Sequence, residues 1–477
     1  MRLSRWKVLP LSVLAFAFGL ARAAGVPAPV YEVEGCCALC PEARDARRYD
    51  TGSLKNSVTL VEGEGDWLFR SRLDLRTDFG TSAHGYRRLR KLRDAFVRRG
   101  VEVVLVYLPT RALVHRDKLA PAVRAGFDFD FDLALMNYKA LLARFARIGF
   151  HVPDLSLLAD EHEEQPFYFR ADTHWTPYGA RRTARVVADA VRRLPAFAGI
   201  ARREFVSRMH GRMVLGSPGV LRDAAEQLCG DSRAREYTDR FVSRPKEIRD
   251  GGDLSGSGGT PQIVLVGTGH SGPAYNFAGF LQEYLGADIL NAAMPDGGLD
   301  GAMVEYLGSA EFRDAPPKIL IWEFSQLYGL EMDSVYRQLL ALLDGGCDGK
   351  PVLLSGKARL RPGKQEVLLN RAASMFTNRE ARMEIRFADT SVKNLRADFS
   401  YMNGRHESLK LAKPALRDTN GRFVFDLRAE GDWADLTLLS VELEGPEAGD
   451  EPQEVELRVC RRQAAAKARG DEEKEPP

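Results

Sequence analysis

Two parts of the chain differ in how hydrophobic and polar residues are arranged. Between about residues 65 and 347, short apolar runs that end at turn residues alternate with stretches whose apolar positions recur every three or four residues. Such short runs are typical of strands buried on both faces of a parallel sheet, and the longer spacing is typical of helices. This part is therefore predicted to be an α/β domain. The predicted strands are 101–108, 263–266, 289–290 and 319–322, and the predicted helices are 87–99, 133–147, 179–193, 275–285 and 303–312.

After Cys347 the pattern changes to an alternation of apolar and polar residues. This alternation is typical of strands with one buried and one solvated face, and turn pairs such as Asn403-Gly404 and Asn420-Gly421 separate the segments. Residues 347–462 are therefore predicted to form an all-β sandwich. The charged segment 463–477 holds too few apolar residues to fold and is predicted to be a disordered tail. The predicted strands are 383–387, 423–427, 436–443 and 455–459.

The N-terminus has the features of a cleaved signal peptide. Arg2, Arg5 and Lys7 precede an apolar run over 8–20, and small residues follow at positions 21 and 23. Residues 1–23 are therefore predicted to direct export and to be removed, which leaves 24–346 as the α/β domain. The apolar run is about 13 residues long, too short for a membrane span, and no later segment approaches 18 uninterrupted apolar residues. No membrane span is expected.

Composition and charge exclude two classes of protein. Hydrophobic residues make up 44% and charged residues 28% of the chain, values too close to globular averages for a disordered protein. The 68 Lys and Arg residues nearly balance the 66 Asp and Glu residues, so the net charge is +2. A nucleic-acid-binding protein of this size would carry a much stronger positive field. Nucleic acid is therefore not an expected partner.

The chain has six cysteines, and export would place them in an oxidising compartment where disulfides form. Sequence alone cannot select one pairing among many. Cys347 and Cys460 bracket the C-terminal third, so a bridge between them would hold that region closed. Cys229 would then pair with one of the three N-terminal cysteines, of which Cys40 is preferred. No second cysteine pair or histidine follows at zinc-finger spacing, so no metal site is predicted.

The segment around Asp172 and His174 could supply a general base. Thr176 is a favoured helix N-cap residue and Pro177 suits the first helical position, so both side chains are predicted to lie on the loop that enters a helix. A carboxylate that accepts from one imidazole nitrogen leaves the other nitrogen free to take a proton from a hydroxyl. The alternative is an ordinary surface loop, because Asp-x-His is a common spacing.

A glycine-rich turn follows the strand 263–266. Gly267, Gly269 and Gly272 match the dinucleotide-binding pattern G-x-G-x-x-G. Against that interpretation, Asp288 precedes the next strand rather than ending it, and an exported protein meets little NAD. The favoured interpretation is a nucleophile turn, in which Ser271 meets a base and backbone N–H groups form an oxyanion hole. A turn without catalytic purpose is the remaining alternative.

Residues beyond the strand 319–322 would line the same crevice, because the carboxyl ends of parallel strands meet at one edge of a sheet. Tyr328 lies in that position and could bind a sugar, or it could be an ordinary packed aromatic. Tyr275, just after the glycine-rich turn, is a second candidate for substrate binding.

Several segments together resemble the alginate O-acetyltransferase family. They are Gly-Asp-Trp-Leu-Phe at 65–69, the strand residues Val-Leu-Val-Tyr-Leu followed by Pro-Thr-Arg at 104–111, Asp-Thr-His-Trp-Thr-Pro-Tyr-Gly at 172–179, Val-Gly-Thr at 266–268 and Trp-Glu-Phe at 322–324. The resemblance covers nearly the whole mature chain. It implies an SGNH-hydrolase-like domain of permuted topology, a C-terminal carbohydrate-binding module and periplasmic acetylation of mannuronate residues during alginate export. It also implies no metal or organic cofactor, an acetyl donor delivered by another protein or a small molecule, and contacts with other proteins of the export complex.

The resemblance assigns an Asp, His and Ser triad in chain order, with an acetyl-serine intermediate. Asp172 carries over as the orienting residue and His174 as the general base. The position of the family's serine holds Gly269, which has no side chain. We hypothesise that Ser271 replaces it and that N–H groups near Gly267 and Gly269 hold the oxyanion. The competing hypothesis is an alginate-binding scaffold protein without catalytic activity.

A polyuronate-binding face needs cations for carboxylates and an aromatic ring for the sugar. In the predicted sandwich, Arg396, Tyr401 and Arg405 lie around strand ends and a turn, together with other polar residues. They are the candidates for polymer binding. The alternative is a solvated charged face.

Overall fold

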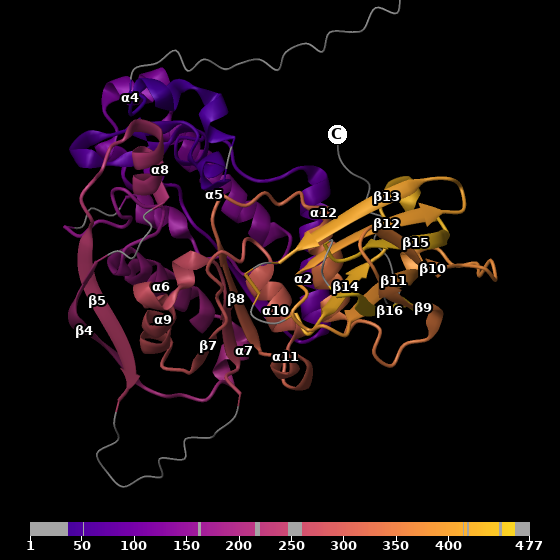
Figure 1. Cartoon of the computed structure of the whole chain (residues 1–477). Helices are drawn as coiled ribbons and strands as arrows, with labels where there is room; N and C mark the ends of the chain where they lie inside the picture. The colour runs from indigo at the N-terminus through magenta and orange to yellow at the C-terminus, as the bar shows by residue number, and fades with distance from the viewer. Residues whose placement is uncertain are drawn as a thin grey trace, which may run out of the picture.

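The structure is a computed structural model that describes residues 37–50, 52–160, 164–214, 220–246, 260–413, 415–416, 419–447 and 451–462. The predicted signal peptide and the predicted charged tail lie outside the described residues. Figure 1 shows two domains side by side, an α/β domain and a smaller domain made mainly of strands. The predicted fold class is therefore confirmed.

The centre of the α/β domain is a parallel four-stranded sheet in the order β3-β8-β6-β7. All of its strands were predicted, because nearly every residue in them is buried and apolar. The main difference is at the end of β8, which continues through Glu323 to Phe324 instead of ending at Trp322. The strands are β3 (Glu102–Tyr107), β6 (Ile263–Val266), β7 (Ile289–Asn291) and β8 (Ile319–Phe324).

Helices cover both faces of this sheet. Figure 1 shows α6 and α9 on one side, and α2, α10 and α12 on the side toward the β-domain. The predicted helix 303–312 is in fact two helices, because the Ser309 side chain accepts a hydrogen bond from the Phe312 N–H and starts a new helix there. The longer helices are α2 (Ala83–Arg98), α5 (Phe131–Arg147), α6 (Pro177–Arg192), α8 (Val220–Cys229), α9 (Phe277–Leu285), α10 (Gly301–Gly308) and α12 (Asp333–Leu343). The shorter helices are α1 (Ser71–Asp74), α3 (Arg111–Val114), α4 (Pro121–Gly126), α7 (Pro195–Ala198) and α11 (Ala310–Asp314).

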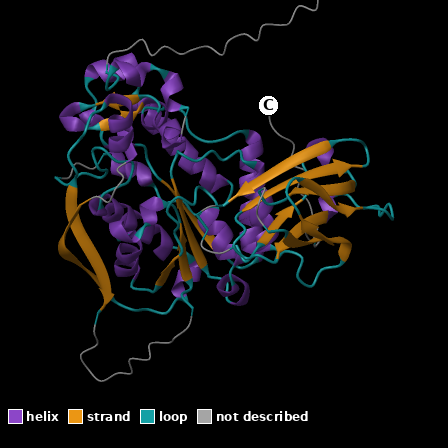
Figure 2. Ribbon diagram, in the orientation of Figure 1, coloured by secondary structure: helices purple, strands orange, loops and turns teal. Residues whose placement is uncertain are grey.

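Two pairs of strands lie outside the main sheet. β1 (Leu60–Glu62) and β2 (Leu68–Arg70) pair antiparallel beside α8, and a small separate core lies between them. β4 (Phe205–Val214) and β5 (Tyr237–Pro245) form a long antiparallel ribbon that packs on α9. Figure 2 shows this ribbon along the edge of the domain. It was not predicted, because most of its residues are at least partly exposed and show no apolar alternation.

The β-domain is a sandwich of two antiparallel four-stranded sheets, in the orders β10-β15-β12-β13 and β14-β11-β16-β9. The inward-facing apolar residues of both sheets form one core. The predicted strands correspond to β11, β14, β15 and β16, and the predicted sandwich is confirmed. The strands are β9 (Val352–Leu360), β10 (Lys364–Leu369), β11 (Ala381–Phe387), β12 (Asn394–Tyr401), β13 (His406–Ala412), β14 (Arg422–Asp426), β15 (Leu438–Glu444) and β16 (Gln453–Arg461).

Buried charged groups join the two domains. Arg337 of α12 donates to the Asp426 backbone oxygen at 2.7 Å and also pairs with Glu407. Arg382 of β11 bridges Asp426 and Asp344, at 2.7 and 2.6 Å. Because removing one partner of a buried ion pair costs about 3–5 kcal/mol, these contacts hold the domains in a defined arrangement.

Both predicted disulfides are present. Cys40 is bonded to Cys229, and Cys347 is bonded to Cys460. The first bond joins the N-terminal segment to the end of α8, and the second closes the β-domain. No helix among the described residues has the length and apolar character needed to cross a membrane.

Candidate active site

Asp172 and His174 form a hydrogen-bonded pair on the loop before α6. Asp172 Oδ1 lies 2.6 Å from His174 Nδ1 and accepts from the His174 backbone N–H at 2.7 Å. Asp172 Oδ2 accepts from the Val220 N–H at 2.9 Å. Burial would raise the pKa of Asp172, but the hydrogen bonds and the neighbouring imidazole hold this pKa below its usual value. The carboxylate is therefore charged and can fix the orientation of the ring.

Two residues that were not predicted as part of the site hold this loop. The buried Arg111 side chain donates to the backbone oxygens of Asp172 at 2.6 Å and Phe169 at 2.8 Å. The Glu236 carboxylate accepts from two successive N–H groups, those of Arg170 at 2.9 Å and Ala171 at 2.8 Å. Both contacts join segments that are far apart in the sequence, so no local pattern could have indicated them.

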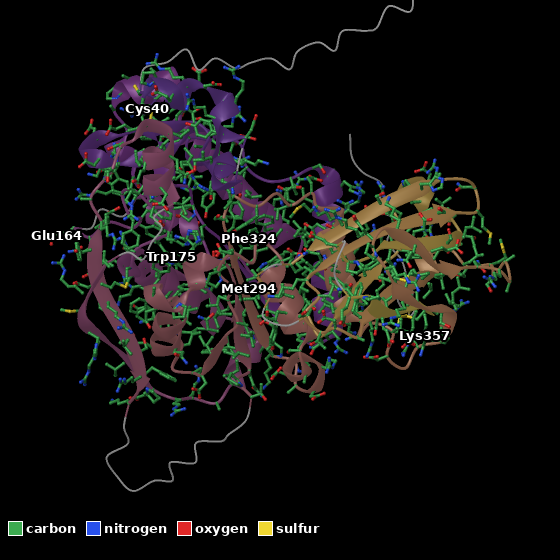
Figure 3. The ribbon with its side chains drawn as sticks, in the orientation of Figure 1. Cys40, Glu164, Trp175, Met294, Phe324 and Lys357 are labelled. Carbon is green, nitrogen blue, oxygen red and sulfur yellow. A yellow bond between two sulfur atoms is a disulfide. The ribbon has the colours of Figure 1, made fainter. Side chains whose placement is uncertain are left out.

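The next residues bring the loop to the glycine-rich turn. Thr176 caps α6, as predicted, by accepting from the Gly179 N–H. Trp175 is fully buried, and its Nε1 donates to the His270 backbone oxygen at 2.7 Å. Figure 3 shows Trp175 and Phe324 near the middle of the α/β domain. The loop and the turn are therefore fixed relative to each other.

The second nitrogen of His174 faces Gly269. A β-carbon added at Gly269 would lie 2.6 Å from His174 Nε2, and its three nearest atoms all belong to that imidazole. The φ angle of Gly269 is not in the left-handed range, so the backbone itself does not require glycine there. The imidazole thus occupies the space where a side chain of residue 269 would begin. No described side chain makes a hydrogen bond to Nε2.

Ser271 does not meet His174. Its side chain is fully buried and donates to Glu323 Oε2 at 2.9 Å. Residues 269–271 form a 3-10 turn, in which residues two positions apart point in different directions. A Ser271 nucleophile would first have to leave Glu323, so the geometry of the described structure does not support that hypothesis.

Glu323 is the centre of a polar network that the sequence did not indicate. This buried carboxylate accepts from the Thr268 N–H at 2.9 Å, from the Thr268 hydroxyl at 3.0 Å and from Ser271. Burial raises the pKa of Glu323, and these hydrogen bonds oppose that effect. The network anchors the glycine-rich turn to β8.

The backbone N–H groups of the turn can be followed one by one. Those of Thr268, His270, Ser271 and Gly272 are all taken, by Glu323 or by oxygens within the turn. The N–H of Gly269 has no acceptor in the described part of the chain. It is therefore available to an oxyanion.

His270 has a structural environment. Its Nδ1 lies 3.2 Å from the Thr268 hydroxyl, and its Nε2 lies 3.2 Å from the Thr173 backbone oxygen. Burial and the charge of His174 lower the pKa of His270 well below its usual value. A neutral His270 fits a role in holding the turn.

The predicted substrate-binding tyrosines differ in exposure. Tyr275 is mostly buried and stacks on His174, with ring centroids 5.3 Å apart and an interplanar angle of 18°. Tyr328 is partly buried at the edge of the core, and burial raises its pKa to about 12. Of the two tyrosines, Tyr275 is the one whose ring packs on the imidazole of the base.

The prediction for Tyr401 is wrong as a sugar-stacking residue. Only 1% of Tyr401 is exposed, because β12 turns this side chain into the sandwich core, where its hydroxyl donates to Glu407. The side chains of Arg396 and Arg405 are exposed and pair with Glu444 and Asp432, and their binding of polymer stays a prediction.

An aromatic ring that the sequence reading missed lies beside Arg405. Trp433 is partly buried, and the guanidinium groups of Arg405 and Arg428 lie 5.4 and 4.5 Å from its ring centroid. Trp433 ends a short 3-10 turn that begins with the exposed residues Gly431 and Asp432. Within the described residues, no group of three or more His, Cys, Asp or Glu side chains could hold a metal ion.

Comparisons with known proteins agree with this architecture. Residues 60–326 match the family model of an SGNH hydrolase-like domain, acetyltransferase AlgX, and residues 346–472 match a C-terminal carbohydrate-binding module. The alginate biosynthesis protein AlgX of Pseudomonas syringae pv. tomato is 54% identical over 462 residues, which is 96% of each chain. The probable alginate O-acetylase AlgJ of Pseudomonas aeruginosa is 27% identical over 289 residues, 56% of this chain and 70% of AlgJ. A solved structure of Pseudomonas aeruginosa AlgX has a TM-score of 0.82 and 47% identity, and the match covers 89% of this chain and all of the other.

Proposed function

Because the chain belongs to the AlgX family of alginate biosynthesis proteins, we propose that it takes part in the O-acetylation of mannuronate residues of alginate in the periplasm. The family and the domain order are those expected from the sequence. The observation that carries the proposal is the pair of Asp172 and His174, whose 2.6 Å hydrogen bond engages Nδ1 while Nε2 has no hydrogen-bond partner among the described residues. That pair is a base ready to accept a proton from a hydroxyl.

In the proposed reaction, His174 Nε2 removes the proton of the hydroxyl that attacks the acetyl group. Asp172 stabilises the imidazolium that forms, since its carboxylate is buried against Nδ1. The Gly269 N–H, which has no acceptor in the described part of the chain, would donate to the carbonyl oxygen as it becomes negative. These protein groups suffice for acyl transfer, and the proposal includes no metal or organic cofactor. The acetyl donor comes from another protein or a small molecule.

The β-domain would hold the polymer. Arg396 and Arg405 are exposed and engaged in surface ion pairs, which cost little to exchange for the carboxylates of a polyuronate. Trp433 adds an aromatic surface beside Arg405. The predicted export signal and the two disulfides support a periplasmic location, where other proteins of alginate export would be its partners.

A second candidate function is an alginate-binding scaffold without catalytic activity. Gly269 favours it, because this residue faces the base and offers no nucleophile. The engagement of Ser271 with Glu323 favours it as well.

The two candidates differ in an assay of acetyl release. The purified mature protein is incubated with a chromogenic acetyl ester, beside His174→Ala and beside His210→Ala, in which an exposed histidine of β4 is removed as a control. An acetylating enzyme is expected to turn over, to lose at least 100-fold in His174→Ala and to be unaffected in His210→Ala. A scaffold gives no turnover above the His174→Ala rate while it still binds alginate.

A further inference from the structure

We propose that the acetyl group passes directly from its donor to the acceptor hydroxyl, without an acetylated serine, and that the acceptor hydroxyl binds to Nε2 of His174 beside the Gly269 backbone. This inference rests on the proposed function, since it assumes that the pair of Asp172 and His174 performs acyl transfer. It differs from the sequence-based hypothesis, which places an acetyl group on Ser271.

The two ring nitrogens of His174 differ in their surroundings. Nδ1 of His174 is engaged by Asp172, whereas no described side chain meets Nε2. The His174 side chain is 24% exposed, so a hydroxyl from outside can reach it. Gly269 contributes no atoms beyond its backbone to that side of the ring. A substrate hydroxyl can therefore make the hydrogen bond that the protein does not supply.

The hydroxyl groups of the turn are engaged away from Nε2. Ser271 and Thr268 both donate to the buried carboxylate of Glu323, at 2.9 and 3.0 Å. Tyr275 stacks on the imidazole, and burial raises its pKa above the usual value, so its hydroxyl stays protonated. None of these hydroxyls is presented to the base. Among these described residues no hydroxyl is placed to receive the acetyl group first, so the substrate hydroxyl is the proposed acceptor.

The proposed step balances as a single displacement. The acceptor hydroxyl gives its proton to Nε2, and its oxygen forms a bond to the carbonyl carbon of an acetyl ester donor. The resulting oxyanion accepts from the Gly269 N–H. The bond from that carbon to the donor oxygen then breaks, and the imidazolium returns the proton to the leaving oxygen. The products are the acetylated sugar and the donor alcohol.

The same geometry predicts what a side chain at position 269 does. In Gly269→Ala, the methyl carbon would lie 2.6 Å from Nε2, so the imidazole must shift and the space for the acceptor is filled. We expect at least a tenfold loss of transfer. Gly269→Ser introduces the same carbon together with a hydroxyl that can be acetylated. The two variants therefore separate the effect of lost space from that of an added nucleophile.

The test combines kinetics with intact-protein mass. Initial rates are measured while a chromogenic acetyl ester and a mannuronate oligosaccharide are varied, for the wild type, His174→Ala, Ser271→Ala, Gly269→Ala and Gly269→Ser. Acid-quenched samples are weighed for an added acetyl group. Direct transfer predicts intersecting double-reciprocal lines and no acetylated wild-type protein. It also predicts a Ser271→Ala rate within about threefold of wild type and an acetyl adduct in Gly269→Ser.

Two other outcomes would contradict direct transfer. Turnover with parallel lines, or with an acetyl group mapped to Ser271 or another residue, overturns direct transfer and leaves the proposed function in place. If no turnover depends on His174, both direct transfer and the proposed function are wrong, and the candidate function as an alginate-binding scaffold is supported. Far-UV circular dichroism and thermal unfolding of each variant show whether a loss reflects misfolding.

Discussion

At the scale of single residues, the hydrogen bonds that join Asp172 to His174 lie within one loop. The two residues lie two positions apart, and the Asp172 carboxylate holds both the imidazole and the backbone N–H of His174. This short spacing explains why the pair could be predicted from the sequence. The partners of the neighbouring turn come from other strands, and Ser271 was assigned the wrong neighbour for that reason.

Asp172→Asn tests the orienting role at this scale. The amide cannot carry the negative charge that stabilises an imidazolium, and its N–H₂ group cannot accept from Nδ1. By analogy with other acid-base pairs of this kind, the rate of acetyl release should fall by about 10³–10⁴-fold. Asp189→Asn, at an exposed ion pair on α6, is the control and should match the wild type. Steady-state kinetics on both proteins check this, and equal rates would contradict the assigned role.

At the scale of elements, buried carboxylates fix the connections between segments. Glu384 on β11 accepts from the Cys347 N–H at 3.1 Å and pairs with Arg422 at 2.9 Å and Arg386. It therefore joins the segment after α12 to two strands of the sandwich. Burial by itself raises the pKa of Glu384, but these hydrogen bonds and charges lower it to about 2.

This shift predicts a pH-dependent contribution to stability. A carboxyl group with a lowered pKa in the folded state stabilises the fold above its unfolded pKa, near 4.5, and loses that contribution as the pH falls toward about 2. Glu384→Gln should therefore unfold at a lower temperature than the wild type at pH 7, and the difference should shrink between pH 4.5 and 2. Calorimetric scans across this range measure it. A difference that is independent of pH would show that charge is not the cause.

At the scale of the whole molecule, two separate cores are held together by ion pairs. The α/β domain and the sandwich each bury their own apolar residues, and α12 packs between them against β14. Arg88 of α2 also reaches Glu430 of the β-domain, at 2.6 Å. A polymer bound to the β-domain would therefore stay in a fixed position relative to His174.

Replacement of Arg396 and Arg405 by alanine tests the polymer-binding face. Both side chains are exposed, so their loss should leave the fold intact while it removes two contacts to polymer carboxylates. Retention on an alginate column should fall several-fold, with a weaker dependence on salt than that of the wild type. Arg379→Ala removes another exposed ion pair of this domain, that with Asp435, and is the matched control. Equal retention of the double variant and the control would contradict the assignment.

The sequence determined the features that depend on local patterns. The parallel strands, most helices, the sandwich and the Asp172–His174 loop follow from the spacing of apolar residues and from short-range hydrogen bonds. The positions of the cysteines along the chain favoured the two disulfides that form, although they did not exclude other pairings. Even Tyr401 fits a local pattern, since it continues the inward alternation of Leu395 and Phe399 on β12.

Only the tertiary structure decided which distant groups meet. Glu323 lies on β8 and accepts a hydrogen bond from Ser271 in the turn after β6, so the two side chains approach only when the sheet is assembled. Packing also places Nε2 of His174 against Gly269 and brings Arg405 beside Trp433. Such contacts depend on side-chain direction and burial across the fold, which no spacing along the chain contains. The base could therefore be predicted from the sequence, whereas the access of a hydroxyl to that base could not.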